Sequence, residues 1–571
     1  MSDLNLFDAH CYLGRFTRYQ EGYFCEKADL LAEMDHFGIA EALVVDTLSR
    51  ELDPRAGNPR ILEVCAGEGR LHPAWALAPP FQSLPYPLDE LPARMAEAGV
   101  RAVWLFPGHL HFTLADWNLR PILEVLEQER VPLFVDPSPL LIGGTRDLTN
   151  WDAMVQLCRD HPGLPVVTTE ARMYWPTRQS LSALAAAPNL HIELSPFWLY
   201  QGIEFVCREF GAERLLFGTR LPVREAGGTI AQLQYAEVSE AEKRAIAGDN
   251  LRRLLAEALP GREESGRALV SAPTGSGGDG TSGDQTATAC VPGTDVPTRG
   301  SAMGRFYQAI REAEEPFSGE VLIDIHSHIG YGAPYFIPDS DPATIVRQLR
   351  RHGFSKLVTF AFSGLNADWT WGNDFAYQAM REFPDLLLPL AAVHLWHPEE
   401  MQREMARCCD TMGFWGVKLH PWWNGYPETG PNVRLCCEFC HERGLILTNH
   451  YWGPPSLLEE YAREFPNARL ITGHLVTDDE YCAVVNRNPN VYVCTCLPIN
   501  RPDLMTALSK LDPDKVLFGS DIPDLPLPTG FGSILYARIS DDLKRKIMGL
   551  NAQRLLDQVA PNVQPAMGAT T

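Results

Sequence analysis

The sequence predicts an α/β protein built from two tandem (β/α)8 TIM-type barrels that are joined by a flexible Gly/Ser/Thr-rich linker. Three observations lead to this prediction. The chain has 571 residues, more than one ordinary domain needs. Its two halves repeat the same motifs in the same order. In the second half, short β-rich runs alternate with amphipathic, helix-like stretches.

The internal repeat divides the chain into two copies of one domain, each of about 250 residues, the usual size of such a barrel. Three segments of the first copy match segments of the second: one at the start of each copy, one near its end and one at its end. The matched pairs are LNLFDAHCYLG at 4–14 with VLIDIHSHIG at 321–330, RLLFGTRLP at 214–222 with KVLFGSDIP at 515–523, and KRAIAGDNLRRLL at 243–255 with KRKIMGLNAQRLL at 544–556.

The stretch at 260–304 separates the copies. It is rich in Gly, Ser, Thr and Pro and lacks apolar periodicity, which is typical of a flexible tether. We therefore expect a first barrel at 1–259, a disordered linker at 260–304 and a second barrel at 305–571.

Eight strand-then-helix units fit into the second copy, and this number is typical of a (β/α)8 barrel. Alternation alone also fits a doubly wound open sheet, so the positions of the polar residues decide between the two. The expected strands lie near 321–326, 356–361, 387–394, 416–420, 445–450, 469–474, 491–496 and 515–520.

Polar side chains stand at the ends of these strands, where the catalytic groups of a barrel gather. His326 and His328 close the first strand, and their i, i+2 spacing puts both on one face. Closure of the barrel brings Asp521, at the end of the eighth strand, beside them. With His450 from the fifth strand they form a plausible Zn²⁺ shell that leaves a position for water. His474, on the sixth strand, is placed to transfer protons or to orient the substrate.

These motifs resemble the amidohydrolase superfamily, in its amidohydrolase-related branch, which contains metal-dependent hydrolases and lactonases beside non-oxidative decarboxylases. The resemblance implies metal ligation by four side chains, with His474 as a further ligand or the catalytic acid/base, and Asp521 as the second catalytic group. The matching motifs are IDIHSHIG, GFWGVKLHP, LTNHYWG, LITGHL, NVYVCT, LFGSDIP and IMGLNAQRLL. The implied ligands are His326, His328, His450 and Asp521.

The fourth strand leaves the number of metal ions open. In some relatives a lysine of this strand is carboxylated and bridges two metals. Lys418 is the candidate, but His420 lies two residues nearer the strand end. We expect one ion of Zn²⁺, or of another divalent metal such as Mn²⁺, in preference to two. Cys494 and Cys496 on the seventh strand face one way, either as barrel lining or as soft ligands.

Aromatic residues are frequent in the loops after the strands of the second copy, as in pockets for apolar or planar ligands. The alternative is that they seal an interface with the first copy. Arg501 is a candidate partner for a substrate carboxylate. The predicted substrate-binding side chains are Lys418, His420, Trp422, Trp452 and Arg501, and the other loop aromatics are Tyr331, Tyr335, Phe336, Trp369, Trp371, Trp396, Trp423 and Tyr451.

The first copy lacks most of these groups. Tyr12 stands in place of His328, and Arg220 stands in place of Asp521. A cation at the position of a carboxylate repels a metal ion. We therefore expect a degenerate barrel that packs on the active copy as an intramolecular pseudo-dimer. A metal-free pocket in which Arg220 holds an anion is the alternative. The other replacements are Trp104 for Lys418, Phe106 for His420, Asp136 or Pro137 for His450, and Glu170 for His474.

The predicted activity is hydrolysis of a C–N or C–O bond in a small amide, lactone or ester, with metal-bound hydroxide as the attacking group. The alternative is non-oxidative decarboxylation of an aromatic or unsaturated carboxylic acid. The net charge of −23 argues against a nucleic-acid partner. No run of 18 apolar residues and no signal peptide stands out, so we expect no membrane partner and a cytoplasmic location.

Overall fold

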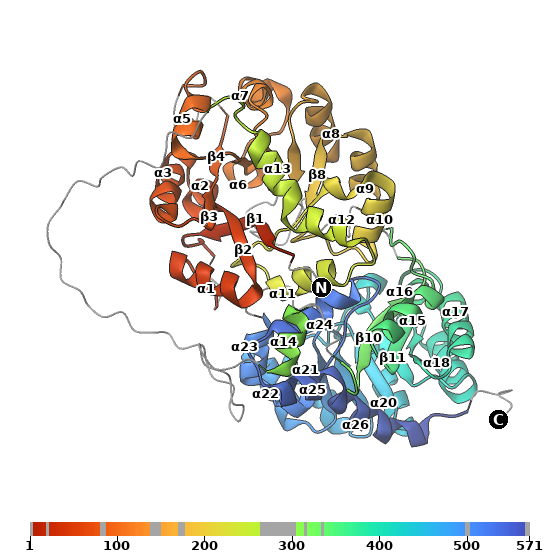
Figure 1. Ribbon diagram of the computed structural model, residues 1–571. Helices are drawn as coiled ribbons and strands as arrows, with labels where there is room; N and C mark the ends of the chain where they lie inside the picture. The colour runs from red at the N-terminus through yellow and green to blue at the C-terminus, as the bar shows by residue number, and fades with distance from the viewer. Residues whose placement is uncertain are drawn as a thin grey trace.

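Each half of the chain folds as a closed barrel of parallel strands surrounded by helices, in the computed structural model that Figure 1 presents. The prediction of two (β/α)8 barrels is confirmed. The predicted linker at 260–304 lies almost entirely outside the described residues. The structure describes residues 4–18, 22–79, 87–137, 150–169, 177–262, 304–312, 317–332, 336–496 and 503–565.

In the described residues of the first half, nine strand segments make eight strands, because β3 and β4 are one strand interrupted at Ala74. The amide of Ala74 donates to Val44 O at 2.9 Å and so continues the ladder. The ring closes where Ala9 N donates to Phe217 O at 2.9 Å. The strands are β1 (Leu6–Leu13), β2 (Ile39–Asp46), β3 (Leu71–Pro73), β4 (Trp75–Leu77), β5 (Val103–Leu105), β6 (Leu133–Val135), β7 (Val166–Thr168), β8 (Leu190–Glu193) and β9 (Leu215–Leu216).

The second half repeats this arrangement within its described part, with β12 and β13 forming one strand interrupted at Leu390, whose amide donates to Thr359 O. Ile325 N donates to Phe518 O at 2.9 Å and closes the ring. All eight predicted strands are present. They are β10 (Ile323–Ile329), β11 (Lys356–Ala361), β12 (Leu387–Pro389), β13 (Ala391–Ala392), β14 (Gly416–Leu419), β15 (Ile446–Asn449), β16 (Arg469–Thr472), β17 (Val491–Cys494) and β18 (Val516–Leu517).

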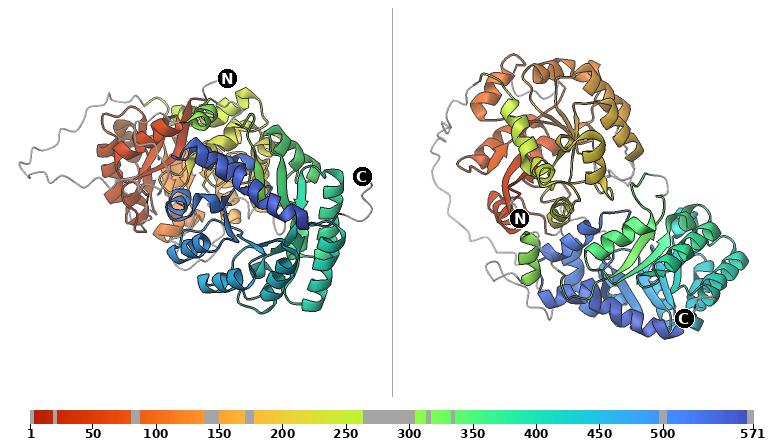
Figure 2. Two further views of the ribbon diagram at one scale, coloured as in Figure 1. Left: turned by 90° about the horizontal axis from the view of Figure 1, so that it is seen from below. Right: turned by 45° about the vertical axis from the view of Figure 1, so that its right-hand side comes forward.

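Helices cover the outside of both rings (Figures 1 and 2). Those of the first half are α1 (Lys27–Phe37), α2 (Thr47–Glu51), α3 (Pro54–Cys65), α5 (Leu91–Ala98), α6 (Pro107–Leu110), α7 (Asp116–Gln128), α8 (Trp151–Asp160), α9 (Thr177–Ala186), α10 (Gly202–Phe210), α11 (Ala226–Gln234), α12 (Glu240–Arg244) and α13 (Asn250–Glu257). Those of the second are α14 (Arg305–Arg311), α15 (Pro342–Arg351), α16 (Phe362–Asn366), α17 (Trp369–Glu382), α18 (Pro398–Ala406), α19 (Pro421–Asn424), α20 (Asn432–Arg443), α21 (Pro455–Glu464), α22 (Asp479–Arg487), α23 (Asp503–Lys510), α24 (Leu527–Tyr536), α25 (Asp541–Arg545) and α26 (Asn551–Val559).

Local sequence signals determine where these helices begin and end, and α15 is an example. Asp341 caps its first turn by accepting from Thr344 N at 3.0 Å, and proline occupies the first helical position. The helix buries Ile345 and Leu349 against the barrel. It ends before Gly353, which has a φ of 78° that glycine adopts without strain.

The sequence repeat is also a repeat of hydrogen bonds. Asn250 donates to the carbonyls of Ala212 and Leu215 in the first half, and Asn551 donates to Pro513 and Val516 in the second. A π-helical turn precedes each asparagine, at Ala245–Asp249 and Lys546–Leu550. The two copies therefore share the packing that attaches their last helices to the barrel.

The barrels contact each other through the equivalent helices α11 and α24, each of which follows the last strand of its own barrel (Figure 1). Small residues allow the helices to approach closely. A Cβ atom added at Gly532 would lie 2.5 Å from the Cβ of Ala231 and 2.6 Å from Gly227 O. Ser533 Oγ of α24 donates to Glu225 Oε2, at the start of α11, at 2.8 Å.

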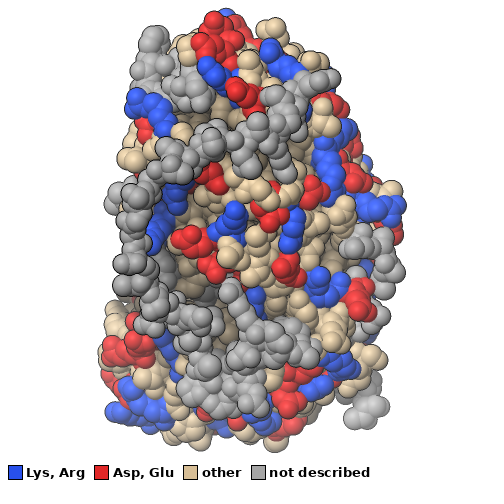
Figure 3. All heavy atoms as spheres, turned by 60° about the vertical axis from the view of Figure 1, so that its left-hand side comes forward, with Lys and Arg blue, Asp and Glu red and all other residues tan. Residues whose placement is uncertain are grey.

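On the face that Figure 3 shows, basic and acidic side chains are interspersed, and no broad basic area is visible among the coloured atoms. None of the helices in the described part of the chain has the length and apolar character that a bilayer crossing requires.

We predict that Gly532→Ala destabilises the protein, because the new methyl group overlaps Ala231 and the backbone of Gly227. The expected loss in the free energy of unfolding is about 1–3 kcal/mol, as for other overpacked sites. Urea denaturation measures it. Gly69→Ala is the control, since a Cβ there meets nothing within 4 Å. Equal stability of the two variants would contradict the close contact of α11 with α24.

Candidate metal centre

Two imidazoles and a carboxylate converge at the end of the second barrel where the first and last strands meet. His328 Nε2 lies 3.1 Å from Asp521 Oδ1, and His326 Nε2 lies 3.6 Å from the same oxygen. Ligand atoms of a tetrahedral Zn²⁺ stand roughly 3.3 Å apart, because each bond is about 2.0–2.1 Å long. The spacing and the donor types therefore fit a divalent metal.

The backbone holds Asp521 in this place. Its φ is 64°, a left-handed conformation that aspartate tolerates better than most residues. Its amide donates to His326 O at 3.0 Å, which joins the end of the last strand to the first. Burial opposes the charge of Asp521, but the hydrogen bond from His328 and the nearby imidazoles outweigh it and hold the pKa well below the usual range. The centre thus contains an ionised carboxylate.

The imidazoles around this carboxylate are neutral. Burial lowers the pKa of His326 and of His328, and the positive Lys418 nearby lowers both further. Neutral imidazole is the form that binds a metal. Both residues are at most 5% exposed.

Two glycines provide the space that His326 occupies. A Cβ atom at Gly519 would lie 2.8 Å from the Cβ of His326, and one at Gly473 would lie 3.1 Å from its Cε1 atom. The glycines of LFGSDIP and LITGHL therefore admit the imidazole between the strands.

Lys418 lies beside the imidazoles. Its Nζ atom is 3.2 Å from His326 Nε2 and lies over the ring of Phe360, 4.5 Å from the centroid. Complete burial lowers the pKa of this ammonium group to about 8. Lys418 faces the candidate metal ligands, as a residue at this position of the fourth strand should.

His450 and His474 form a separate pair. His474 Nε2 lies 3.0 Å from His450 Nδ1, and the ring of His450 stacks on His420 with centroids 3.8 Å apart. The His474 ring lies 5.6 Å from that of His326. Burial lowers the pKa of His474 to about 4, so its imidazole is neutral near pH 7. The pair borders the centre, and ligation by His450 stays a prediction.

Cys496 is a candidate ligand that the sequence singled out only weakly. Among the described residues, one group of side chains has its potential ligand atoms all within 4.8 Å of one another, and it consists of His326, Cys496 and Asp521. Two of the ligands predicted from the sequence, His328 and His450, are outside this group. His328 nevertheless contacts one of its members, because its Nε2 atom lies 3.1 Å from Asp521 Oδ1.

The predicted substrate-binding side chains are in different environments. His420 stacks on Trp423, with centroids 4.3 Å apart, and Trp422 lies 6.2 Å from it with half of its surface exposed. Trp452 is buried instead, and its indole donates to Ile471 O at 3.2 Å. Arg501 lies outside the described residues.

Several loop aromatics of the second barrel are open to solvent. Their exposed fractions range from 50% to 82%, so packing against the first barrel does not bury them. This group consists of Tyr331, Trp371, Trp396, Trp422 and Tyr451. The expectation that these rings surround an opening is favoured over the alternative that they seal the interface.

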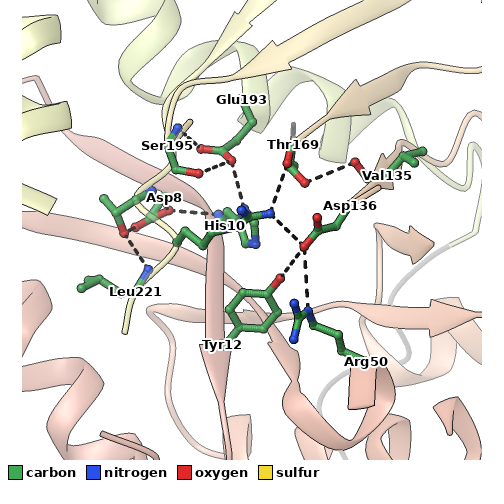
Figure 4. Close-up of polar contacts among 12 residues, drawn as sticks. Asp8, His10, Tyr12, Arg50, Val135, Asp136, Thr169, Glu193, Ser195 and Leu221 are labelled. Carbon is green, nitrogen blue, oxygen red and sulfur yellow. Dashed lines mark hydrogen bonds and ion pairs between the residues drawn. The ribbon is translucent and has the colours of Figure 1, made fainter. Parts of the chain in front are cut away.

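The first barrel has the same backbone geometry but an internal ion pair in place of the centre (Figure 4). Arg220 has a φ of 60°, and its amide donates to His10 O at 2.8 Å, as Asp521 donates to His326. Its guanidinium lies 2.8 Å from Asp136 Oδ2, and Tyr12 donates to the same oxygen at 3.1 Å. This ion pair joins the strand positions at which the second barrel carries Asp521 and His450.

Polar side chains at neighbouring positions of the first barrel bond to one another. His10 Nδ1 lies 2.9 Å from Glu193 Oε2, which also accepts from Ser195 Oγ at 2.7 Å (Figure 4). Trp104 and Phe106 stack on each other in the apolar interior of this barrel. Glu170 lies outside the described residues. Since Asp136 neutralises Arg220, the arrangement favours the expected loss of the site over a pocket in which Arg220 holds an anion.

We predict that Asp136→Asn destabilises the first barrel by about 3–5 kcal/mol, because it leaves the buried Arg220 without its counter-charge. Chemical denaturation measures the change, and a second substitution, Arg220→Met, should recover most of it. Asp35→Asn is the control, since it removes an exposed ion pair with Arg70 worth at most about 1 kcal/mol. Equal effects of the two Asp→Asn changes would argue against the buried ion pair.

Comparison with known proteins identifies both halves. The Amidohydro_2 profile, described as "Amidohydrolase", matches residues 17–256 and 323–558. A comparison with curated proteins finds no match. Similar solved structures include an uncharacterised TIM-barrel protein from Bordetella bronchiseptica (18% identity, 42% of this chain and 99% of that one, TM-score 0.33).

Two similar structures carry an activity in their descriptions. One is a dihydroxybenzoic acid decarboxylase from a Polaromonas species, with bound manganese and an inhibitor (16% identity, 42% of this chain and 97% of that one, TM-score 0.33). The other is a 4-oxalomesaconate hydratase from Rhodopseudomonas palustris (15% identity, 42% of this chain and 97% of that one, TM-score 0.34).

Proposed function

Because the chain belongs to the amidohydrolase family, whose members are metal-dependent enzymes, we propose that its second barrel hydrolyses a C–N or C–O bond of a small substrate. The observation that carries this proposal is the approach of His326 and His328 to the ionised Asp521 at the end of the barrel. Neutral imidazoles that border this group supply sites for proton transfer.

His326, His328 and Asp521 would hold one divalent ion. When bound, such a metal polarises a substrate oxygen and lowers the pKa of a water molecule in its shell. Two imidazoles and a carboxylate suit Zn²⁺, whereas Mn²⁺ prefers oxygen ligands. One ion is favoured over two, because the described ligand atoms within 4.8 Å of one another form a single group.

His474 is the proposed acid/base. Its Nε2 atom lies 3.0 Å from His450 Nδ1, and this hydrogen bond orients the two rings. The ring of His450 also stacks on His420, which further restricts the orientation of the His450–His474 pair. A neutral imidazole held in this way accepts a proton from an attacking water and returns it to the leaving group.

The substrate is proposed to be planar or aromatic. The exposed rings of Trp371, Trp396 and Trp422 lie in the segments that follow β11, β13 and β14, at the end of the barrel that carries the centre. Aromatic side chains on convergent loops bind planar ligands by stacking. The same observation favours the second candidate function, decarboxylation of an aromatic acid, in which His474 would protonate the carbon that loses carbon dioxide.

The first barrel is proposed as a non-catalytic scaffold in an intramolecular pseudo-dimer. The Asp136–Arg220 ion pair and the packing of α11 on α24 support this role. The division of the chain at 1–259, 260–304 and 305–571, the lack of a nucleic-acid or membrane partner and the cytoplasmic location remain predictions from the sequence.

We predict that the purified protein, expressed with supplementary zinc, holds about one metal ion per chain. His328→Ala should lose the ion, because it removes a side chain that contacts Asp521. Elemental analysis measures the content. Tyr12→Phe, at the equivalent strand position of the first barrel, is the matched control and should leave the content unchanged. Less than roughly 0.3 ion per chain in the parent protein would overturn the metal centre.

A substrate screen tests the reaction. We expect turnover of aromatic amides, esters or lactones, and Asp521→Asn should reduce it by at least about 100-fold, since it removes a proposed ligand. Hydroxybenzoate-type acids form the second arm, with released carbon dioxide as the readout. Release of carbon dioxide without turnover in the first arm would replace the hydrolase proposal by the decarboxylase.

A further inference from the structure

We propose that Cys496 is a thiolate ligand of the metal and that, with His326, His328 and Asp521, it makes the centre selective for a soft ion such as Zn²⁺. This inference rests on the proposed metal centre and adds a ligand to it. Its basis is the group formed by Cys496, His326 and Asp521, whose potential ligand atoms all lie within 4.8 Å of one another.

The backbone places this sulfur inside the barrel. Thr495 N donates to Leu517 O at 2.8 Å, which extends the pairing of β17 with β18 up to the residue before Cys496. The carbonyl of Cys496 accepts from Leu475 N at 3.3 Å, in the segment that follows the other neighbouring strand, β16. Cys496 is therefore held from both sides, and it is completely buried.

Cys494, the last residue of β17 and two residues before Cys496, provides an internal comparison. Its sulfur accepts from Cys496 N at 3.3 Å and fills the space beside Gly519, where an added Cβ atom would lie 2.2 Å from it. Cys494 is not part of the group of ligand atoms within 4.8 Å. Of the two thiols, Cys494 packs between the strands and Cys496 faces the candidate ligands.

The first barrel replaces this sulfur. Leu194 N donates to Leu216 O at 2.9 Å, as Thr495 donates to Leu517, so Ser195 occupies the position of Cys496. The hydroxyl of Ser195 donates to Glu193 Oε2 at 2.7 Å. The barrel that carries Arg220 in place of Asp521 thus also carries an internally bonded hydroxyl in place of the thiol.

Cys496 belongs to the group of potential ligand atoms within 4.8 Å of one another, and His450 does not. The Nδ1 atom of His450 is engaged by His474, and its ring is stacked on His420. Binding of the thiol breaks its S–H bond, whose electron pair enters the bond from sulfur to metal, while the proton leaves to solvent. No oxidation occurs. Thiolate favours Zn²⁺ over the harder Mn²⁺ and Mg²⁺.

Cobalt substitution tests the ligand directly, because Co²⁺ bound to thiolate has a sulfur-to-metal charge-transfer absorption in the near ultraviolet. The full-length protein is stripped of metal and loaded with Co²⁺, and the bound cobalt is quantified. We expect the band in the parent protein and in the control Cys494→Ser. Cys496→Ser should lose the band while it retains bound cobalt and an unchanged far-ultraviolet circular dichroism spectrum.

Competition with a chelator gives the second readout. The dissociation constant for Zn²⁺ should rise by at least about 100-fold in Cys496→Ser, and that for Mn²⁺ should change much less. A band that survives in Cys496→Ser, or a loaded parent protein without a band, overturns the inference and leaves the metal centre intact. A parent protein that binds neither cobalt nor zinc overturns both.

Discussion

The hydrogen bonds that close each barrel between its first and last strands determine the geometry on which the rest of the molecule depends. Asp324 accepts from His326 N at 3.1 Å and from Ser520 N at 3.2 Å, and Asp8 does the same for His10 and Thr219 in the first barrel. These carboxyl groups are completely buried, and burial raises the pKa of each to about 7. Their contacts hold Asp521 beside His326 and Arg220 beside His10, although the side chains of Asp521 and Arg220 differ.

The two copies therefore differ in chemistry and share their backbone. Asp521 and Arg220 have φ values of 64° and 60°, and their amides make the same hydrogen bond to the first strand. In the second barrel this position delivers an anion to two neutral imidazoles, and a metal cation is the natural complement. In the first barrel it delivers a cation, and Asp136 is the complement. The guanidinium of Arg220 thus supplies the positive charge that a metal ion would supply in the second barrel.

The sequence predicted the fold well, because an alternation of apolar runs and amphipathic stretches is a local signal and the repeat supplied it twice. It also predicted that His326, His328 and Asp521 meet, since the i, i+2 spacing defines a strand face and closure joins the last strand to the first. The prediction weakened where a side chain's direction depends on its neighbours. Trp452 points into the core, and the positions of His450 and His474 at the ends of their strands did not predict that the two rings pair.

The position of Asp521 also links the centre to the first barrel. Asp524 N and Leu525 N donate to Asp521 O at 2.7 and 3.1 Å, so a tight turn connects this residue to the start of α24. That helix packs closely on α11, because small residues bring the two backbones together. If the first barrel is a scaffold, as proposed, it would contribute to the reaction of the second barrel by restricting the position of α24 and, through this turn, of Asp521.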